Sequence, residues 1–415
     1  MDIILFVTVV TVALALLFDF TNGFHDAANA TSTVIATKSL TPRQAVGMSA
    51  VFNFLPAFVI GTAVANTISK TVKLDALPAV AEGSLPIGLK VTMAALLGAI
   101  FWNFFTWAVG MPSSSSHALI GGLIGAGLSA GGTDAVSWST VQKTAIAIFA
   151  SPLIAFLVAY LASYLVKGIQ KGFKLDEDHE FFRWSQVFSN AFVSWGHGAN
   201  DAQKTMGIIA ATLFAGGFLQ ADDASKLEPP SWVVFAAHIA IAVGTFYGGW
   251  KIIETMGTKL TRITRASGLA ANLGAITSIN GATHYGIPIS TTHAAASSVI
   301  GSGVGSGHRV HFATIRNMVI AWVFTLPMAG IVGALTYKGI ALPGVFGGTL
   351  ATAFIAGLLI YGVRLMLKST TADDVAKRVD EQQEHARLEK LAAKLPSDSP
   401  DNVVELIEEI WPSKK

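Results

Sequence analysis

An internal repeat is the feature that most limits how this chain can fold. Three motifs of the first half recur in the second half, the first after 175 residues and the other two after 176. The matched segments are 23–30 with 198–205, 97–100 with 273–276, and 112–117 with 288–293. Three motifs that share nearly one offset predict two related halves rather than a series of unrelated domains.

Composition places these halves in a lipid bilayer. Of the 415 residues, 52% are hydrophobic and 13% are charged, and the mean hydropathy is +0.55. Soluble domains carry about 25% charged residues, so we expect a polytopic membrane protein. The formal net charge of +2, without a basic and aromatic patch, gives no indication of a nucleic-acid partner. The chain has no cysteine, which excludes disulfides and thiolate metal sites.

Eleven apolar segments follow one another along the chain, on the criterion that a span needs roughly 20 residues. The first segment lacks the basic start and the cleavage site of a signal peptide, so we expect it to be a transmembrane helix. The segments lie near residues 3–37, 44–66, 88–111, 115–131, 140–166, 184–214, 232–250, 266–286, 290–306, 312–337 and 347–367.

The lengths of these segments predict where the helices are irregular. The first and sixth are longer than a bilayer requires, so we expect each to be unwound near the glycines of the repeated motif. The fourth and ninth are short and rich in glycine and serine, which favours re-entrant or short helical hairpins buried in protein. The expected fold is an all-α polytopic membrane protein built from two repeats of about five segments each.

The distribution of lysine and arginine predicts the orientation. If the N-terminus lies outside, the outer loops hold only Lys70, Lys73, Lys226 and Lys338. The inner loops then hold Lys38, Arg43, Lys167, Lys171, Lys174, Arg183, Lys251, Lys259, Arg262, Arg265 and Arg309. Because five segments is an odd number, the second half enters the membrane the opposite way up, and the repeats are inverted.

These boundaries give the expected domain organisation. Residues 1–166 form the first repeat, 167–183 a cytoplasmic linker, 184–337 the second, inverted repeat, and 347–367 an additional transmembrane helix. Residues 368–415 form a soluble cytoplasmic tail, with a charged helix over 371–395 and a short helix over 403–411. We expect this tail to be solvated and structurally minor rather than a regulatory or oligomerisation element.

An acid stands at the equivalent position of both halves, within segments apolar enough to lie in hydrocarbon. Charge at that depth is costly, so Asp26 and Asp201 are candidate functional residues. With a neighbouring amide such as Asn29, they offer the oxygen ligands that a small cation such as sodium prefers. A carboxylate in a dry pocket would instead carry a coupling proton. Capping of backbone N–H groups is the structural alternative.

Clustered hydroxyls form the second part of the predicted site. Residues 113–116 and 290–292 follow a helix-ending proline and lead into a helix, so their O–H and N–H donors suit a tetrahedral oxyanion. Capping of the following helix is the alternative function of such a turn. Lys204 replaces Asn29 of the other half, and its ammonium either attracts an anion or occupies the place of a bound cation.

Five histidines fall in or beside these motifs. We expect each of them to be a hydrogen-bonded packing residue, with a proton relay through one of them as the alternative. They are His25, His117, His197, His284 and His293.

These motifs together resemble the signatures of the PiT family of inorganic phosphate transporters. The match spans residues 1–367 and includes four motifs in the same order. The resemblance implies symport of inorganic phosphate with sodium or protons, by inverted repeats, in a homodimer in the bacterial inner (plasma) membrane. It implies no enzymatic activity and no cofactor, apart from a possible bound sodium ion.

The residues and the resemblance give two sets of candidate site residues. The expected phosphate-binding residues are Ser114, Ser115, Ser116, Ser290, Thr291, Thr292, Asn200, Gln203 and Lys204. The residues expected to couple transport to a proton or cation are His25, Asp26, Asn29 and Asp201, of which the last three are also the candidate sodium ligands.

Two departures from the family pattern bear on the coupling ion. The family carries asparagine where this chain has His25, and sodium-coupled relatives carry Val-Ala-Asn-Ala where residues 202–205 read Ala-Gln-Lys-Thr. Loss of an oxygen ligand and gain of an ammonium favour coupling to protons over sodium, or to fewer sodium ions than the sodium-coupled members use. A permease for sulfate or another oxyanion, and an uncoupled anion channel, are the alternatives. A membrane hydrolase is disfavoured because the hydroxyl turns form symmetric pairs, whereas catalysis needs differentiated roles.

Overall fold

The computed structural model describes residues 3–79, 84–221, 226–343, 345–368 and 370–392, and in these ranges the ordered elements are helices plus two isolated β-bridges. The first half contains α1 (Ile3–Ala36), α2 (Pro42–Phe54), α3 (Ala63–Ser69), α4 (Ile87–Val109), α5 (Ser115–Gly131) and α6 (Trp138–Phe173). The second contains α7 (Glu180–Ala215), α8 (Ser231–Tyr247), α9 (Trp250–Thr258), α10 (Arg265–His284), α11 (Thr291–Ser306) and α12 (Phe312–Ile340). The last two helices are α13 (Val345–Leu367) and α14 (Ala372–Ala392).

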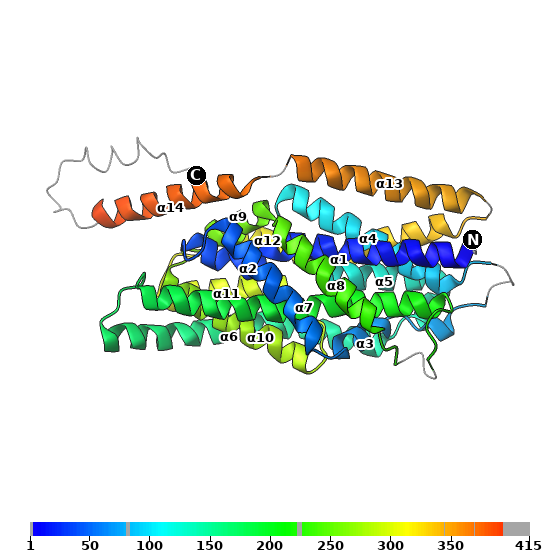
Figure 1. Ribbon diagram of the computed structural model, residues 1–415, viewed down its shortest axis with the longest axis horizontal. Coiled ribbons are helices and arrows are strands. Elements are labelled where there is room, and N and C mark those ends of the chain that lie inside the picture. Colours follow the sequence, from blue (N-terminus) through cyan, green and yellow to red (C-terminus); the bar gives the residue numbers. More distant parts are fainter. Residues whose placement is uncertain (1–2, 80–83, 222–225, 344, 369, 393–415) are drawn as a thin grey trace.

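The two halves present the same succession of helices. In each, a long helix is followed by a bent pair, a hairpin and a second long helix. The bent pairs are α2 with α3, at 86°, and α8 with α9, at 69°. Figure 1 shows most of these helices running along the long axis of the molecule, with α13 and α14 against one side. The expectation of an all-helical, repeat-like membrane fold is therefore confirmed.

Five helices of the described chain are long and apolar enough to cross a membrane, or up to seven if each bent pair is counted as one span. The five are α1, α4, α6, α12 and α13. Helices α5 and α11, with 17 and 16 residues, are shorter than a span requires. Large apolar side chains are exposed on α6, α12 and α13, as expected of surfaces in contact with lipid. The chain is an integral membrane protein.

Helices α1 and α7 are continuous, so the expected unwound middle at the repeated motif is wrong. The glycines of the motif serve close packing instead. A β-carbon at Gly23 would lie 2.1 Å from the carbonyl oxygen of Ile241, and one at Gly198 would lie 2.3 Å from that of Asn53. Glycine thus lets each long helix touch the backbone of the bent helix beside it, and the breaks occur in the bent pairs.

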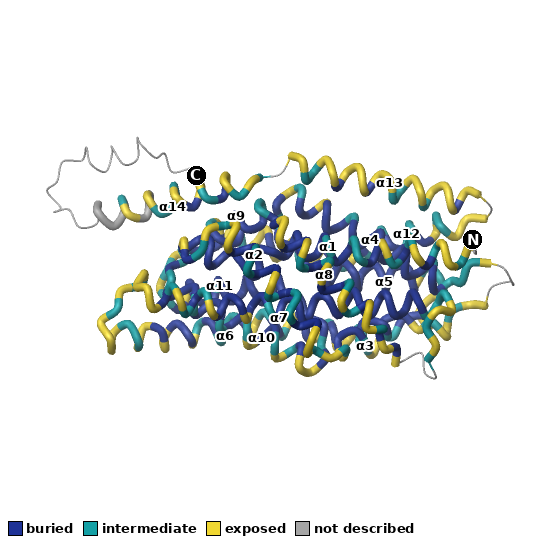
Figure 2. The backbone as a smooth tube through the Cα atoms, viewed as in Figure 1, coloured by how far each residue is buried: buried dark blue, intermediate teal, exposed yellow. Residues whose placement is uncertain are grey.

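The hydroxyl turns form the tips of two hairpins, α4–α5 and α10–α11. Ser114 accepts a hydrogen bond from the backbone N–H of His117, and Ser290 accepts one from that of His293, at 3.2 Å in both cases. The rings of the two histidines lie 4.6 Å apart, centroid to centroid. The tips therefore meet in the buried middle of the molecule, which Figure 2 shows in dark blue.

The C-terminal helix α14 packs on the body of the protein, so the tail is not the structurally minor appendage expected from the sequence. Its Val375 and Val379 are buried in an apolar cluster that includes α9. Arg378 pairs with the nearly buried Glu254 of α9, and Asp380 lies 2.5 Å from Lys38. The second tail helix expected over 403–411 lies outside the described residues.

Candidate functional site

The candidate site lies where α1 and α7 pass the two hairpin tips. Every residue predicted for it is buried, and the aspartates and Lys204 are at most 1% exposed. Helices α1 and α7 bring one acid from each half, while the first turns of α5 and α11, with the residue just before each, bring the hydroxyls. The tertiary structure thus brings together residues separated by up to 267 positions in the sequence, from His25 to Thr292.

Asp26 is held by its own helix and by the first hairpin. Its Oδ1 lies 2.6 Å from Nδ1 of His25, and Ser115 donates a hydrogen bond of 3.1 Å to its Oδ2. The other ring nitrogen of His25 lies 3.3 Å from the hydroxyl of Thr106 and 3.4 Å from that of Ser113. A chain of exchangeable protons therefore connects the first hydroxyl turn to the carboxylate through the imidazole.

Asp201 is held by four groups. Lys204 donates to its Oδ1 at 2.6 Å, and Thr291 of the second hairpin donates to its Oδ2 at 3.1 Å. The amide of Asn22 donates to the same Oδ2 at 3.3 Å, and Nε2 of His197 lies 3.5 Å from it. Each aspartate therefore accepts a hydrogen bond from the equivalent hydroxyl of its own half.

The residues three positions after the aspartates reach across to the opposite half. Asn29 donates to the hydroxyls of Thr291 and Thr292 at 3.3 and 3.1 Å. Its equivalent, Lys204, donates to the hydroxyl of Ser116 at 2.5 Å. Because Ser116 and Thr292 are also equivalent, the repeat places two matching contacts between the halves.

The ammonium of Lys204 is fully compensated although it is 0% exposed. It donates to Asp201, to Ser116 and, at 2.8 Å, to the carbonyl of Ile289. These three contacts use all three donors of an ammonium. A buried charge persists only when it is paired and hydrogen-bonded in this way. Lys204 therefore provides a fixed positive charge between a carboxylate and a hydroxyl turn.

Four predicted oxyanion ligands have their polar atoms engaged elsewhere. Ser114 and Ser290 cap α5 and α11. Asn200 donates to the hydroxyl of Thr283 at 2.9 Å, at the end of α10. Gln203 accepts from the backbone N–H of Val64 at 2.9 Å, at the start of α3. Asn200 thus joins α7 to the second hairpin, and Gln203 joins it to the bent pair α2–α3. The centre is formed by the other nine predicted residues.

His197, Asn22 and Asp19 are buried at the site but absent from the predicted set. His197 stands four residues before Asp201, on the same face of α7, and this spacing is the signal that would have revealed it. Asn22 and Asp19 stand four and seven residues before Asp26, and this helical spacing places them on the same face of α1 as Asp26. Asp19 lies near Thr205, Asp201 and Lys204.

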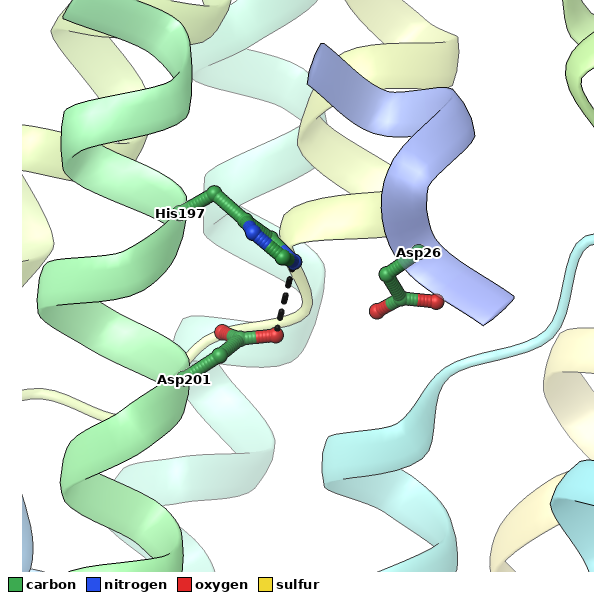
Figure 3. A group of neighbouring side chains, drawn as sticks. All are labelled: Asp26, His197 and Asp201. Atoms are coloured by element: carbon green, nitrogen blue, oxygen red, sulfur yellow. Dashed lines mark ion pairs between the residues drawn. The ribbon is translucent and has the colours of Figure 1, made fainter. Parts of the chain in front are cut away.

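Three of the buried groups are arranged to hold a cation. One ligand atom from each of Asp26, His197 and Asp201 lies within 4.8 Å of the other two. Figure 3 shows the three side chains converging from α1 and α7. The amide oxygens of Asn22 and Asn29 have no hydrogen-bond partner among the described residues. The oxygen donors fit a small hard cation, whereas the ammonium of Lys204 already occupies one side of Asp201.

This combination defines a class of protein. Two related halves of membrane helices, with hairpin tips and opposed buried acids meeting at the centre, characterise transport proteins. Residues 127–131 have the spacing Gly-x-Ser-x-Gly, but they lie in α5 rather than on a strand-to-helix turn, so they do not form a nucleophile elbow.

Residues 22–333 match the phosphate transporter family, and the chain belongs to that family. A probable low-affinity inorganic phosphate transporter of Rhizobium meliloti (strain 1021) is 44% identical over 335 residues, covering 79% of this chain and 94% of the relative. One of Bacillus subtilis (strain 168) is 43% identical over 340 residues, covering 81% and 98%. The resemblance seen in the sequence motifs is thereby confirmed, and the protein is a transporter rather than an enzyme.

A solved structure described as the sodium-dependent phosphate transporter has the same fold. It superposes with a TM-score of 0.68 over 80% of this chain and 98% of the other, at 24% sequence identity.

Proposed function

We propose that this protein carries inorganic phosphate across the bacterial plasma membrane by symport with a cation, and that the cation is a proton. One observation carries the proposal. A buried centre combines two acids from opposed halves, two hydroxyl turns and a fixed ammonium, in a chain that belongs to the phosphate transporter family. Hydroxyls of Ser115, Ser116, Thr291 and Thr292, with Lys204, would bind the phosphate oxygens. To do so, the donors now bonded to Asp26, Asp201 and the carbonyl of Ile289 would exchange these acceptors for the anion.

The two carboxylates supply the physical reason for coupling. An oxyanion bound to these hydroxyls would lie close to Asp26 and Asp201, which accept hydrogen bonds from Ser115 and Thr291. Two like charges about 5 Å apart repel by roughly 3 kcal/mol at an effective dielectric constant of about 20. Neutralising a carboxylate removes that repulsion, so a proton or a cation and the anion favour each other's binding.

The arrangement around each acid supports protons as the coupling ion. Lys204 already supplies a cation to Asp201. His25 joins Asp26 to the hydroxyls of Thr106 and Ser113, which gives a proton a route to the carboxylate. Imidazole is the side chain whose charge changes near neutral pH.

Sodium at Asp26 is the second candidate for the coupling ion. The free amide oxygen of Asn29 favours it, because that atom lacks a partner among the described residues and oxygen ligands suit sodium. The solved structure with this fold is described as a sodium-dependent phosphate transporter, and this description applies to that other protein.

Purified protein in liposomes tests the function. Labelled phosphate should accumulate against its gradient when an inward proton gradient is imposed, and an equal sodium gradient at fixed pH should have no effect. Strict dependence on sodium would refute proton coupling. Counterflow of labelled phosphate driven by unlabelled phosphate distinguishes a carrier from a channel, and competition by sulfate tests the substrate.

We further propose that the N-terminus lies outside, that the tail is cytoplasmic, and that the protein is a homodimer. The basic loops support this orientation, since those around Lys38, Arg183 and Arg262 lie at the end of the molecule that carries α14 (Figure 1). Protease access to the tail in right-side-out and inverted vesicles tests the orientation, and cross-linking in native membranes tests the dimer.

A further inference from the structure

A polar stripe leads along α1 from the buried centre to the end of the molecule that carries α14. After Asp26 it comprises Asn29, Thr33 and Thr37, spaced by three or four residues and therefore on one face of the helix. Eleven residues of helix between Asp26 and Thr37 correspond to about 16 Å, roughly half the thickness of the hydrocarbon layer.

Two amides of α7 face this stripe. The hydroxyl of Thr33 lies 3.4 Å from Oδ1 of Asn190 and closer, at 3.0 Å, to Oδ1 of Asn272 on α10. Thr37 donates to Oε1 of Gln186 at 2.8 Å. Both amides are at most 1% exposed. Their amide nitrogens, Nδ2 of Asn190 and Nε2 of Gln186, have no hydrogen-bond acceptor among the described residues. Nε2 of Gln186 lies against Gly268 of α10, 2.0 Å from where a β-carbon would stand on that glycine. A buried donor without a partner is costly and calls for an explanation.

The stripe opens into a charged cavity. Thr37 lies in the wall of a cavity of about 530 Å³, together with Lys38, Arg262 and Arg265. Each of these three cations also has an acidic partner, Asp380, Glu177 and Glu180 respectively. Asp178 lines the cavity as well. Because the cations are already paired, the cavity would not hold an anion tightly.

The repeat accounts for only part of the stripe. The positions equivalent to Thr37 and Gln186 in the other half are Thr212 and Thr11, which are also polar and buried. The positions equivalent to Thr33 and Asn190 are Ile208 and Ala15, which are apolar. The middle of the stripe, at Thr33 and Asn190, is therefore polar at one end of the molecule only.

We propose that this stripe is the path by which the oxyanion leaves the central site toward the cavity, with Asn190 and Gln186 as its neutral binding steps. The inference rests on the proposed function, because it takes a phosphate-like anion as the cargo. The free N–H donors then have a transient acceptor in each cycle. The stripe carries no charge between Asp26 and Lys38, so a passing anion is solvated without being trapped.

Replacement of the amides tests the path. Asn190→Leu keeps the branched shape of the side chain, Gln186→Met keeps the unbranched length, and both remove the N–H donor together with the amide oxygen. We expect phosphate binding to the purified protein, measured by calorimetry, to change less than about twofold, while net uptake falls at least about tenfold, the effect of roughly one hydrogen bond. Thr31→Val is the matched control, because Thr31 is buried on α1 and donates only to the carbonyl of Ala27. Unchanged uptake, or loss of binding together with uptake, would overturn the proposal.

Chemical access gives a second test that needs no transport assay. The chain has no cysteine, so single cysteines can be introduced by Thr33→Cys and by the control Thr31→Cys. A negatively charged methanethiosulfonate, added on the side of the cavity, should modify the first and spare the second. If the reagent left both cysteines equally unmodified, the proposed path would be refuted. Failure of the wild-type protein to bind or accumulate phosphate would refute the proposed function instead, and the labelling result distinguishes the two failures.

Discussion

Removal of the Lys204 ammonium should make the protein depend on sodium. In Lys204→Asn, Asp201 loses its 2.6 Å partner, and Ser116 and the carbonyl of Ile289 lose a donor. Both Lys204 and Asp201 are 0% exposed, so the carboxylate remains buried and uncompensated. Breaking such a buried pair costs about 3–5 kcal/mol. We expect this loss of stability in sodium-free buffer.

Sodium should restore part of that stability, because a cation can then occupy the vacated side of Asp201. At a concentration 100 times its dissociation constant, a ligand stabilises the folded state by about 2.7 kcal/mol. Thermal unfolding of the detergent-solubilised variant, in sodium and in choline chloride at equal ionic strength, measures both effects. Lys251→Asn is the control, because Lys251 donates to the neutral carbonyl of Ala108 and has no carboxylate to expose. If Lys204→Asn were as stable as wild type without sodium, the ammonium would not be compensating Asp201.

Three further predictions concern the acids, the tail and the packing of α7. Asp26→Asn and Asp201→Asn should each abolish gradient-driven accumulation of phosphate, while size-exclusion profiles of the purified variants stay normal. Arg378→Ala removes the tail's contact with a buried carboxylate on α9, so limited proteolysis should release α14 faster than in wild type, and an unchanged rate would contradict the docking. Gly198→Ala places a β-carbon 2.3 Å from a carbonyl oxygen of α2 and should lower the unfolding temperature. The control Gly47→Ala, with nothing within 4 Å, should leave it unchanged.

The sequence was sufficient to predict the class of fold and most members of the central cluster, although it did not single out His197, Asn22 or Asp19. Buried charge in an apolar segment is costly wherever it occurs, so Asp26, Asp201 and Lys204 could be recognised without coordinates. The common offset of the motifs related Ser115 to Thr291, and each hydroxyl was found on its own aspartate. These inferences hold because they depend on residue type and spacing alone.

The helix breaks could not be predicted in the same way. Glycine in a helical segment is compatible with an unwound turn and with a close helix contact, and the sequence does not say which neighbour approaches. Only the packed structure shows that Ile241 lies against Gly23 and Asn53 against Gly198. It also shows that α1 and α7 are continuous at these glycines. The docked position of α14 likewise depends on contacts with distant segments, among them Glu254, a buried acid 124 residues before Arg378.

What the sequence determined by itself is therefore a membrane protein of two related halves with charge at its centre, since composition, period and the cost of buried charge are local properties of the chain. What only the tertiary structure decided is which partner each charge has. Asn29 and Lys204 are equivalent by sequence, yet one contacts hydroxyls alone and the other also forms an ion pair with Asp201. The pairing follows from how α1, α7 and the hairpin tips pack, because contacts between distant segments are fixed by three-dimensional proximity and not by spacing along the chain.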